Sequence, residues 1–152
     1  MADAAKEQVT EKAASASVNL ADLASKAEDQ GQAMEVRHPN SGEVLRFEDG
    51  RAFTITLVGK DSDRFLELQR KITDRRLQAM QRSRQPLMTA MAEKDEIELL
   101  VNATLTWDVM FGDNGSSKPS PENYRKAYTS IRWLRRQVDE FVGNTGNFFK
   151  TT

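Results

Sequence analysis

A change of hydrophobic period decides the fold, and it lies in residues 53–68, which read FTITLVGKDSDRFLEL. Apolar and polar residues alternate at first, so Phe53, Ile55 and Leu57 share one face of a predicted strand. Beyond the polar run 61–63 the apolar residues recur at helical spacing, and this run offers Asp and Ser side chains that cap a helix. The stretch therefore predicts a strand followed directly by a helix.

Two further strands are predicted upstream of this one. Residues 34–38 alternate between apolar and polar, and the turn-forming residues 39–42 follow them. Residues 43–47 read as a second strand, which ends at a Glu-Asp-Gly turn over 48–50. We expect the three strands to form an antiparallel meander within 34–59, with one face covered by the rest of the chain, because so small a sheet is not stable alone.

Helical periodicity dominates the sequence after the meander. The spacing predicts one helix that ends at Gln85-Pro86, and a second over about 88–107. Ser120-Pro121 then marks a helix start, and two short apolar stripes follow it before Gly143 stops the last helix. The predicted fold class is therefore α+β, with a small three-stranded antiparallel meander followed by a bundle of about four helices.

Residues 1–33 differ in composition from the rest of the chain. They contain three lysines, six carboxylates and no aromatic residue, and they have too little apolar surface to form a core of their own. We expect a partly disordered or helical segment, with an ordered helix over about 19–29 as one of the two outcomes. Residues 34–150 are expected to form a single domain, with the meander in 34–59 and the helices in 60–150.

The charges are balanced overall and are unevenly distributed. The 152 residues contain 22 Lys and Arg against 23 Asp and Glu, which gives a formal net charge of −1. Residues 64–84 carry seven cations and two carboxylates, whereas 1–33 and 93–98 are acidic. The basic helix could stay solvated, meet an acidic protein partner or meet phosphate, and the acidic segments could neutralise it within the chain or between copies. The near-zero net charge argues against a general nucleic-acid binder.

Composition and spacing also exclude several kinds of active site. The chain has no cysteine, and its one histidine, His38, precedes Pro39 in a predicted turn, so we interpret it as facing solvent. Asp61 and Asp63 are explained by helix capping and Asp113 by a polar turn, since the spacing of a calcium loop is missing. We expect no enzyme activity, cofactor or metal. We also expect no membrane span or secretory signal, because no apolar run approaches about 18 residues.

Flexible and aromatic side chains are the first candidates for contact with other proteins. Met80, Met88 and Met91 flank the predicted break at Pro86, where they either fill gaps in the core or form an adaptable apolar surface. Trp107 and Trp133 are expected in the core by default. Phe148 and Phe149 follow the last predicted helix, so they either fold back on the bundle or anchor another chain.

The order of several motifs resembles the tail assembly chaperones of long-tailed bacteriophages. In sequence order they are a tryptophan-ended helix at 102–107, a polar loop with Asp113 and Gly115, a Ser-Pro-Glu-Asn helix start at 120–123, a Trp-Leu-Arg-Arg-Gln-Val segment at 133–138 and an Asn-Phe-Phe ending at 147–149. A hairpin turn at 38–43 and Gly59-Lys60-Asp61-Ser62 also fit, so the resemblance covers roughly residues 34–149.

This resemblance implies a non-enzymatic protein of the host cytoplasm that takes part in viral assembly. Such chaperones bind the tape measure protein, keep its long hydrophobic helices soluble and help recruit the tail tube protein, and self-association is a further expectation. In the lambda-type system a longer form arises by ribosomal frameshift. Under this hypothesis the expected partner-contact residues are Arg70, Arg75, Arg76, Arg82, Trp133, Arg136, Phe148 and Phe149.

Two alternatives remain open on the sequence. The first is a structural tail or head-tail connector component of the virion, which would assemble through the edge of the meander. The second is a nucleic-acid-binding regulator that uses the basic helix, although we do not expect nucleic acid as the partner.

Overall fold

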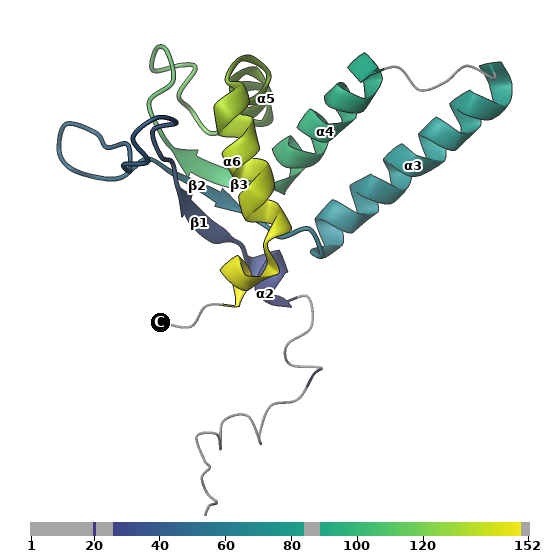
Figure 1. Ribbon diagram of the computed structural model, residues 1–152, viewed down its shortest axis with the longest axis horizontal. Coiled ribbons are helices and arrows are strands. Elements are labelled where there is room, and N and C mark those ends of the chain that lie inside the picture. Colours follow the sequence, from purple (N-terminus) through teal and green to yellow (C-terminus); the bar gives the residue numbers. More distant parts are fainter. Residues whose placement is uncertain (1–19, 21–25, 84–88, 150–152) are drawn as a thin grey trace, which may run out of the picture.

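The computed structural model describes residue 20 and residues 26–83 and 89–149, and it has an α+β fold (Figure 1). The helices are α2 (Lys26–Gln30), α3 (Asp63–Ser83), α4 (Thr89–Ala103), α5 (Pro121–Ser130), α6 (Arg132–Gly143) and the 3-10 helix η1 (Thr145–Phe148). The strands are β1 (Gln32–Glu35), β2 (Thr54–Leu57) and β3 (Thr104–Asp108). Most of the helix expected over 19–29 lies outside the described residues. Its described part is α2.

The three strands form one antiparallel sheet in the order β1-β2-β3, as the predicted class requires. Ile55 of the central strand stands opposite Met34 on one side and Trp107 on the other. The structure corrects which segments form this sheet, however. The predicted strand at 43–47 takes part only in isolated bridges within a long hairpin, and the third strand comes from 104–108, where a helix was expected.

The switch from α4 to β3 has a local physical cause. The Thr104 hydroxyl donates to the Leu100 carbonyl oxygen (2.8 Å), so it satisfies one of the carbonyls that the helix end leaves free. Thr104, Thr106 and Trp107 are residue types enriched in strands, which favours a pleated, half-buried strand here. Buried residues at 100, 104 and 107 fit a helical period as well, which is why spacing alone predicted a helix through Trp107.

The core lies between one face of the sheet and the helices α4, α5 and α6 (Figure 1). Ile55 and Leu57 are fully buried there and Phe53 is half-buried against them, which confirms the predicted strand face. The largest fully buried side chain is Tyr128 of α5. No helix among the described residues is long and apolar enough to cross a membrane.

Both predicted helix starts are confirmed by their capping contacts. The Ser62 hydroxyl accepts from the Phe65 amide (3.3 Å) at the start of α3, and the Ser120 hydroxyl accepts from the Asn123 amide (3.2 Å) at the start of α5. Helix α6 ends at Gly143 as expected. The predicted break at Gln85-Pro86 lies outside the described residues.

Helix α2 is hydrogen-bonded to the residues at the start of α3. The folded body therefore extends upstream of residue 34. The Glu28 carbonyl accepts from the Gly59 amide (3.0 Å), and its carboxylate accepts from the Asp61 amide (3.3 Å). The neighbouring Asp29 carboxylate accepts from the Asp63 amide (2.7 Å). Two carboxylates from α2 therefore supply acceptors to the amino terminus of α3, where unpaired amides favour negative charge.

A buried hydroxyl pair links α5 to the junction of α4 and β3, and it gives the first testable prediction. The Tyr128 and Thr104 hydroxyl oxygens lie 2.7 Å apart, and because Thr104 donates to Leu100, Tyr128 is the donor to Thr104. Tyr128→Phe removes this bond and should lower the free energy of unfolding by about 1–3 kcal/mol in a urea titration, because the Thr104 oxygen loses its donor. In a Thr104→Val background the same change should cost less, and equal costs in both backgrounds would show that the pair contributes nothing.

Candidate functional site

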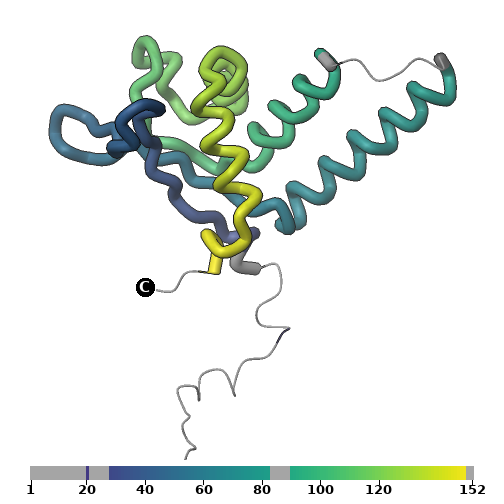
Figure 2. The backbone as a smooth tube through the Cα atoms, in the orientation of Figure 1, coloured from purple at the N-terminus to yellow at the C-terminus, as the bar shows by residue number. Residues whose placement is uncertain are grey.

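Helices α3 and α4 form a hairpin, called here the hairpin arm and defined as residues 63–83 and 89–103, in which α4 packs against α5 and α6 and α3 diverges from the body toward its distal end. Figures 1 and 2 show the two helices close together at the base, with α3 diverging from α4 and from the body toward its distal end. At the base, the Arg64 guanidinium donates to the Asn102 carbonyl (3.3 Å) and the Asn102 amide donates to the Arg64 carbonyl (2.9 Å). The base of the arm is therefore held by reciprocal side-chain to backbone bonds.

A second tie joins the two helices farther along the arm. Asp95 of α4 accepts from Arg76 (2.9 Å) and also lies 3.9 Å from Arg75, so two of the predicted contact residues are partly engaged within the chain. The Asp95 side chain is 16% exposed, which strengthens the ion pair relative to one in open water. Asp95 confirms that the acidic segment 93–98 neutralises part of the basic helix within the chain.

The other carboxylates of that acidic segment pair with helices of the body instead. Glu93 accepts from Arg135 of α6 (2.8 Å), and Glu98 accepts from two nitrogens of Arg125 of α5 (2.5 and 3.0 Å). These pairs fasten α4 to the bundle. As a result, Asp95 is the one carboxylate of α4 that forms an ion pair with α3 among the described residues.

Distal to the Asp95 tie, the arm exposes large apolar side chains. Leu77 is 53% exposed and Met80 is 48% exposed on α3, and Met91 is 46% exposed on α4. Met91 lies beside Ala79 in a surface hollow of about 220 Å³ that also contains Arg75 and Lys94. Met80 and Met91 therefore form surface rather than fill the core, whereas Met88 lies outside the described residues.

Several cations of α3 have no acidic partner in the part of the chain that the structure describes. Among the described residues, no carboxylate lies within ion-pair distance of Arg70, Lys71 or Arg82, and all three side chains are exposed. Arg70 and Arg82 belong to the predicted contact set. The arm thus contains both predicted cations and exposed apolar side chains.

The remaining predicted contact residues lie elsewhere. Trp133 is half-buried and Arg136 is exposed, both on α6. Phe148 is 2% exposed and packs edge-on against Phe141, with 5.5 Å between ring centroids. Of the two predicted outcomes for the aromatic ending, the structure shows the fold-back, so Phe148 is not part of an exposed contact surface, while Phe149 is half-buried.

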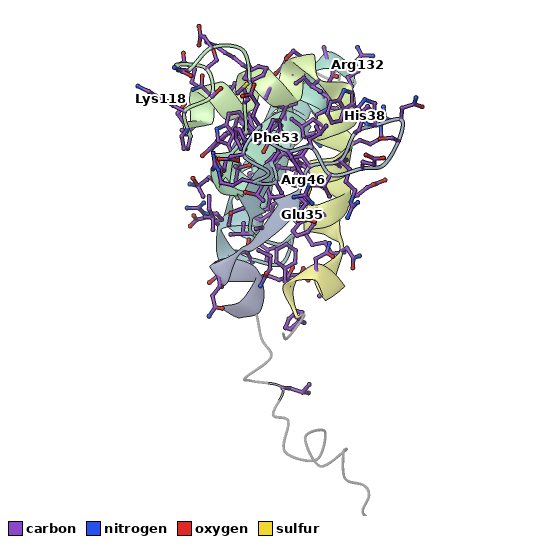
Figure 3. The ribbon with its side chains drawn as sticks, turned by 90° about the vertical axis from the view of Figure 1, so that its left-hand side faces the viewer. Glu35, His38, Arg46, Phe53, Lys118 and Arg132 are labelled. Carbon is purple, nitrogen blue, oxygen red and sulfur yellow. The ribbon has the colours of Figure 1, made fainter. Side chains whose placement is uncertain are left out.

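A second surface feature lies on the opposite side of the body and was not predicted. Figure 3 shows this face, with Phe53 at its centre, Lys118 to one side and His38 and Arg132 to the other. Phe53 contributes to an apolar hollow of about 160 Å³ that also contains Trp107 and Trp133. Sequence periodicity could not find this hollow, because its walls come from segments far apart in the chain.

The polar residues interpreted as structural have structural contacts. The exposed His38 ring nitrogen Nδ1 accepts from the amides of Asn40 (3.1 Å) and Ser41 (3.3 Å), as expected for a turn histidine. Asp113 accepts from the Ser116 amide (2.7 Å) in a polar turn, and this bond lowers the pKa of its carboxyl. These contacts explain both residues without a catalytic role.

Glu28 is a buried carboxyl whose ionisation affects stability. It is 2% exposed, and burial, opposed by its bond from the Asp61 amide, raises its pKa above the ordinary value of 4.5. The folded state therefore holds the proton more tightly than the unfolded chain does. The stabilisation that this carboxyl provides is fully present when the pH is below the ordinary pKa of 4.5. It is lost as the pH rises through the higher pKa of the folded state.

The second testable prediction follows from the direction of this pKa shift. Glu28→Gln cannot ionise, so its free energy of unfolding relative to the wild type should rise as the pH is raised above the ordinary carboxyl pKa of 4.5. Urea titrations over a series of pH values measure the difference, and Asp29→Asn, whose side chain is more exposed, serves as the control. A difference that stays constant or falls with rising pH would contradict the prediction.

Comparisons with protein-family models, with curated proteins and with solved structures found no match to this chain. The resemblance to tail assembly chaperones therefore rests on the order of the motifs in the sequence.

Proposed function

We propose that this chain is a non-enzymatic tail assembly chaperone of a long-tailed bacteriophage, acting in the host cytoplasm. Under this proposal it binds the tape measure protein, keeps it soluble during assembly and helps recruit the tail tube protein. The observation that carries the proposal is the hairpin arm, which exposes Leu77 and Met80 on α3 and Met91 on α4. Leu77 and Met80 are three residues apart on one side of α3, and exposed apolar side chains grouped in this way are typical of protein interaction sites.

The properties of the arm support reversible binding to apolar protein segments. Methionine side chains are flexible and polarisable, so they adapt to partners of different shape. The surrounding charges keep such a surface in solution while it is empty. The proposed partner is taken from the resemblance, and the arm is the surface to which we propose that it binds.

Co-expression tests the proposal directly. The tape measure gene of the same phage is expressed alone, with this protein, and with an unrelated soluble protein of similar size. The proposal expects a several-fold larger soluble fraction of the tape measure protein with this chain, and co-purification of the two. An unchanged soluble fraction would contradict it.

The sheet favours one second candidate, a structural component of the virion. Strands β1 and β3 are the two edges of the three-stranded sheet in the described part of the chain, and edge strands can pair with another copy. Mass spectrometry of purified particles separates the two functions. Stoichiometric amounts in the particle would favour the structural role, and absence from the particle would favour the chaperone.

A further inference from the structure

We infer that helix α2 is a detachable strap, which pivots at Gly31 and opens as a unit while the sheet and the larger helices stay folded. In its docked position the strap is hydrogen-bonded to residues 59–63 at the start of α3, and it packs against η1. Opening leaves both of these neighbours without that contact. The device does not depend on the identity of any partner, so it goes beyond the proposed function.

Three backbone amides at the start of α3 take their acceptors from the strap. The Gly59 amide donates to the Glu28 carbonyl oxygen (3.0 Å), and the Asp61 amide donates to the Glu28 carboxylate (3.3 Å). The Asp63 amide donates to the Asp29 carboxylate (2.7 Å). These amides lose their acceptors together when α2 moves away, so they report the opening of the strap.

The docked position of α2 depends on polar contacts, because a helix of five residues is not stable alone. Of the α2 side chains that the structure describes, Glu28 is the buried one (2% exposed), and it ends in a carboxyl. No described cation forms an ion pair with it, and the neighbouring charges of Lys60 and Asp61 act on it in opposite directions. Burying a carboxyl without an opposite charge offsets part of what its hydrogen bond contributes. The strap should therefore open at a lower free-energy cost than the core unfolds.

The connection between α2 and the sheet provides the pivot. Gly31 is the one residue between the end of α2 and the start of β1, and its φ is +83°. Glycine adopts positive and negative φ about equally readily, so a rotation here costs little in backbone conformation. The next residue, Gln32, is already held by its pairing with Leu57 of β2. A rotation at Gly31 therefore moves α2 and leaves the sheet in place.

Amide hydrogen exchange of the full-length protein, followed residue by residue by NMR, tests the inference. Val58 is the internal reference, because its amide donates to the Ala103 carbonyl oxygen (2.8 Å) in the body, whereas the adjacent Gly59 amide donates to α2. The amides of Gly59, Asp61 and Asp63 should be at least about tenfold less protected from exchange than Val58, once the intrinsic rates are divided out. Equal protection of Gly59 and Val58 would overturn the inference.

A variant at one contact tests whether the strap opens as a unit. Asp29→Ala removes the acceptor of the Asp63 amide and leaves the Glu28 carbonyl, which accepts from Gly59, in place. Opening as a unit predicts that exchange at Gly59 also becomes several-fold faster. Glu43→Gln, which changes an exposed carboxyl in the hairpin, is the matched control and should leave these amides unchanged. Faster exchange confined to Asp63 would overturn the inference.

Gly59→Ala displaces the strap without changing any residue of α2. A Cβ at this position would overlap the Glu28 carboxyl oxygen and lie 2.7 Å from both Cγ and Cδ of that side chain. The variant should speed exchange at Asp63 by about tenfold and leave Val58 protected. In a Glu28→Ala background there is no carboxyl to displace, so the same change should have little further effect at Asp63. Equal acceleration in the two backgrounds, or equal acceleration at Val58 and Asp63, would overturn the inference.

Discussion

Replacing Trp107 with alanine is expected to lower the free energy of unfolding by about 3–5 kcal/mol, because it removes the largest aromatic side chain from the core. Trp107 is 5% exposed, and its ring lies 4.8 Å from Tyr124 and 6.2 Å from Phe111, measured between centroids. Its indole nitrogen donates to the Ser117 carbonyl (2.7 Å), which anchors the polar loop after β3. The substitution leaves a cavity and also leaves that carbonyl without its donor.

Urea unfolding followed by circular dichroism measures the loss. The matched control is Trp133→Ala, which removes the same side chain from a half-buried position on α6 and should cost about 1 kcal/mol. A stability loss for Trp107→Ala no larger than that of Trp133→Ala would show that the β3 tryptophan does not hold the sheet to the helices.

Gly31→Ala is the second change with a large expected effect, at about 2–3 kcal/mol of lost stability. Gly31 connects α2 to β1 with φ of +83°, a conformation that side chains with Cβ rarely adopt. A Cβ at this position would also lie 2.6 Å from Leu105 Cδ1 and 3.1 Å from the Leu57 carbonyl oxygen. The leucine side chain can move, but the backbone oxygen belongs to the central strand and cannot move without disturbing the sheet.

Gly50→Ala is the control that separates these two costs. Gly50 also has a positive φ, of +94°, but no atom lies within 4 Å of the position that its Cβ would take. Its substitution should therefore cost about 1 kcal/mol, from the backbone conformation alone. Equal losses at the two glycines in urea titrations would show that the contacts around Gly31 adapt freely.

The parts of the fold that depend on neighbouring residues could be predicted from the sequence. The alternation at Phe53–Leu57 identified the central strand, and Ser62 and Ser120 identified two helix starts. Each of these signals is set by residues within a few positions, through side-chain facing or a single capping bond.

The choice of strand partners could not be predicted in the same way. The segment 43–47 has a strand pattern and lies next to β2 in the sequence, yet β2 pairs with 104–108. Trp107 supplies a large buried side chain opposite Ile55, and the segment 43–47 has no side chain of that size for the helical layer. Pairing therefore follows burial against α4, α5 and α6, which is information that local spacing does not contain.

The candidate site likewise has features that the sequence could predict and features that it could not. The arginines of α3 could be identified as a basic surface from sequence alone, because helical spacing fixes their place on one element. Their lack of acidic partners could not, since it depends on Arg125 and Arg135 engaging the α4 carboxylates across the bundle. The burial of Phe148 likewise depends on Phe141, which one turn of 3-10 helix brings within 5.5 Å.

The position of β3 in the chain has a consequence for synthesis on the ribosome. The central strand ends at Leu57 and its second partner begins at Thr104, so residues 58–103 must emerge before the sheet can be completed. At about 5–20 residues per second, this delay lasts on the order of several seconds. The contacts between α3 and α4 join segments close in sequence within that interval, so they can form before α5 and α6 emerge and complete the packing of α4.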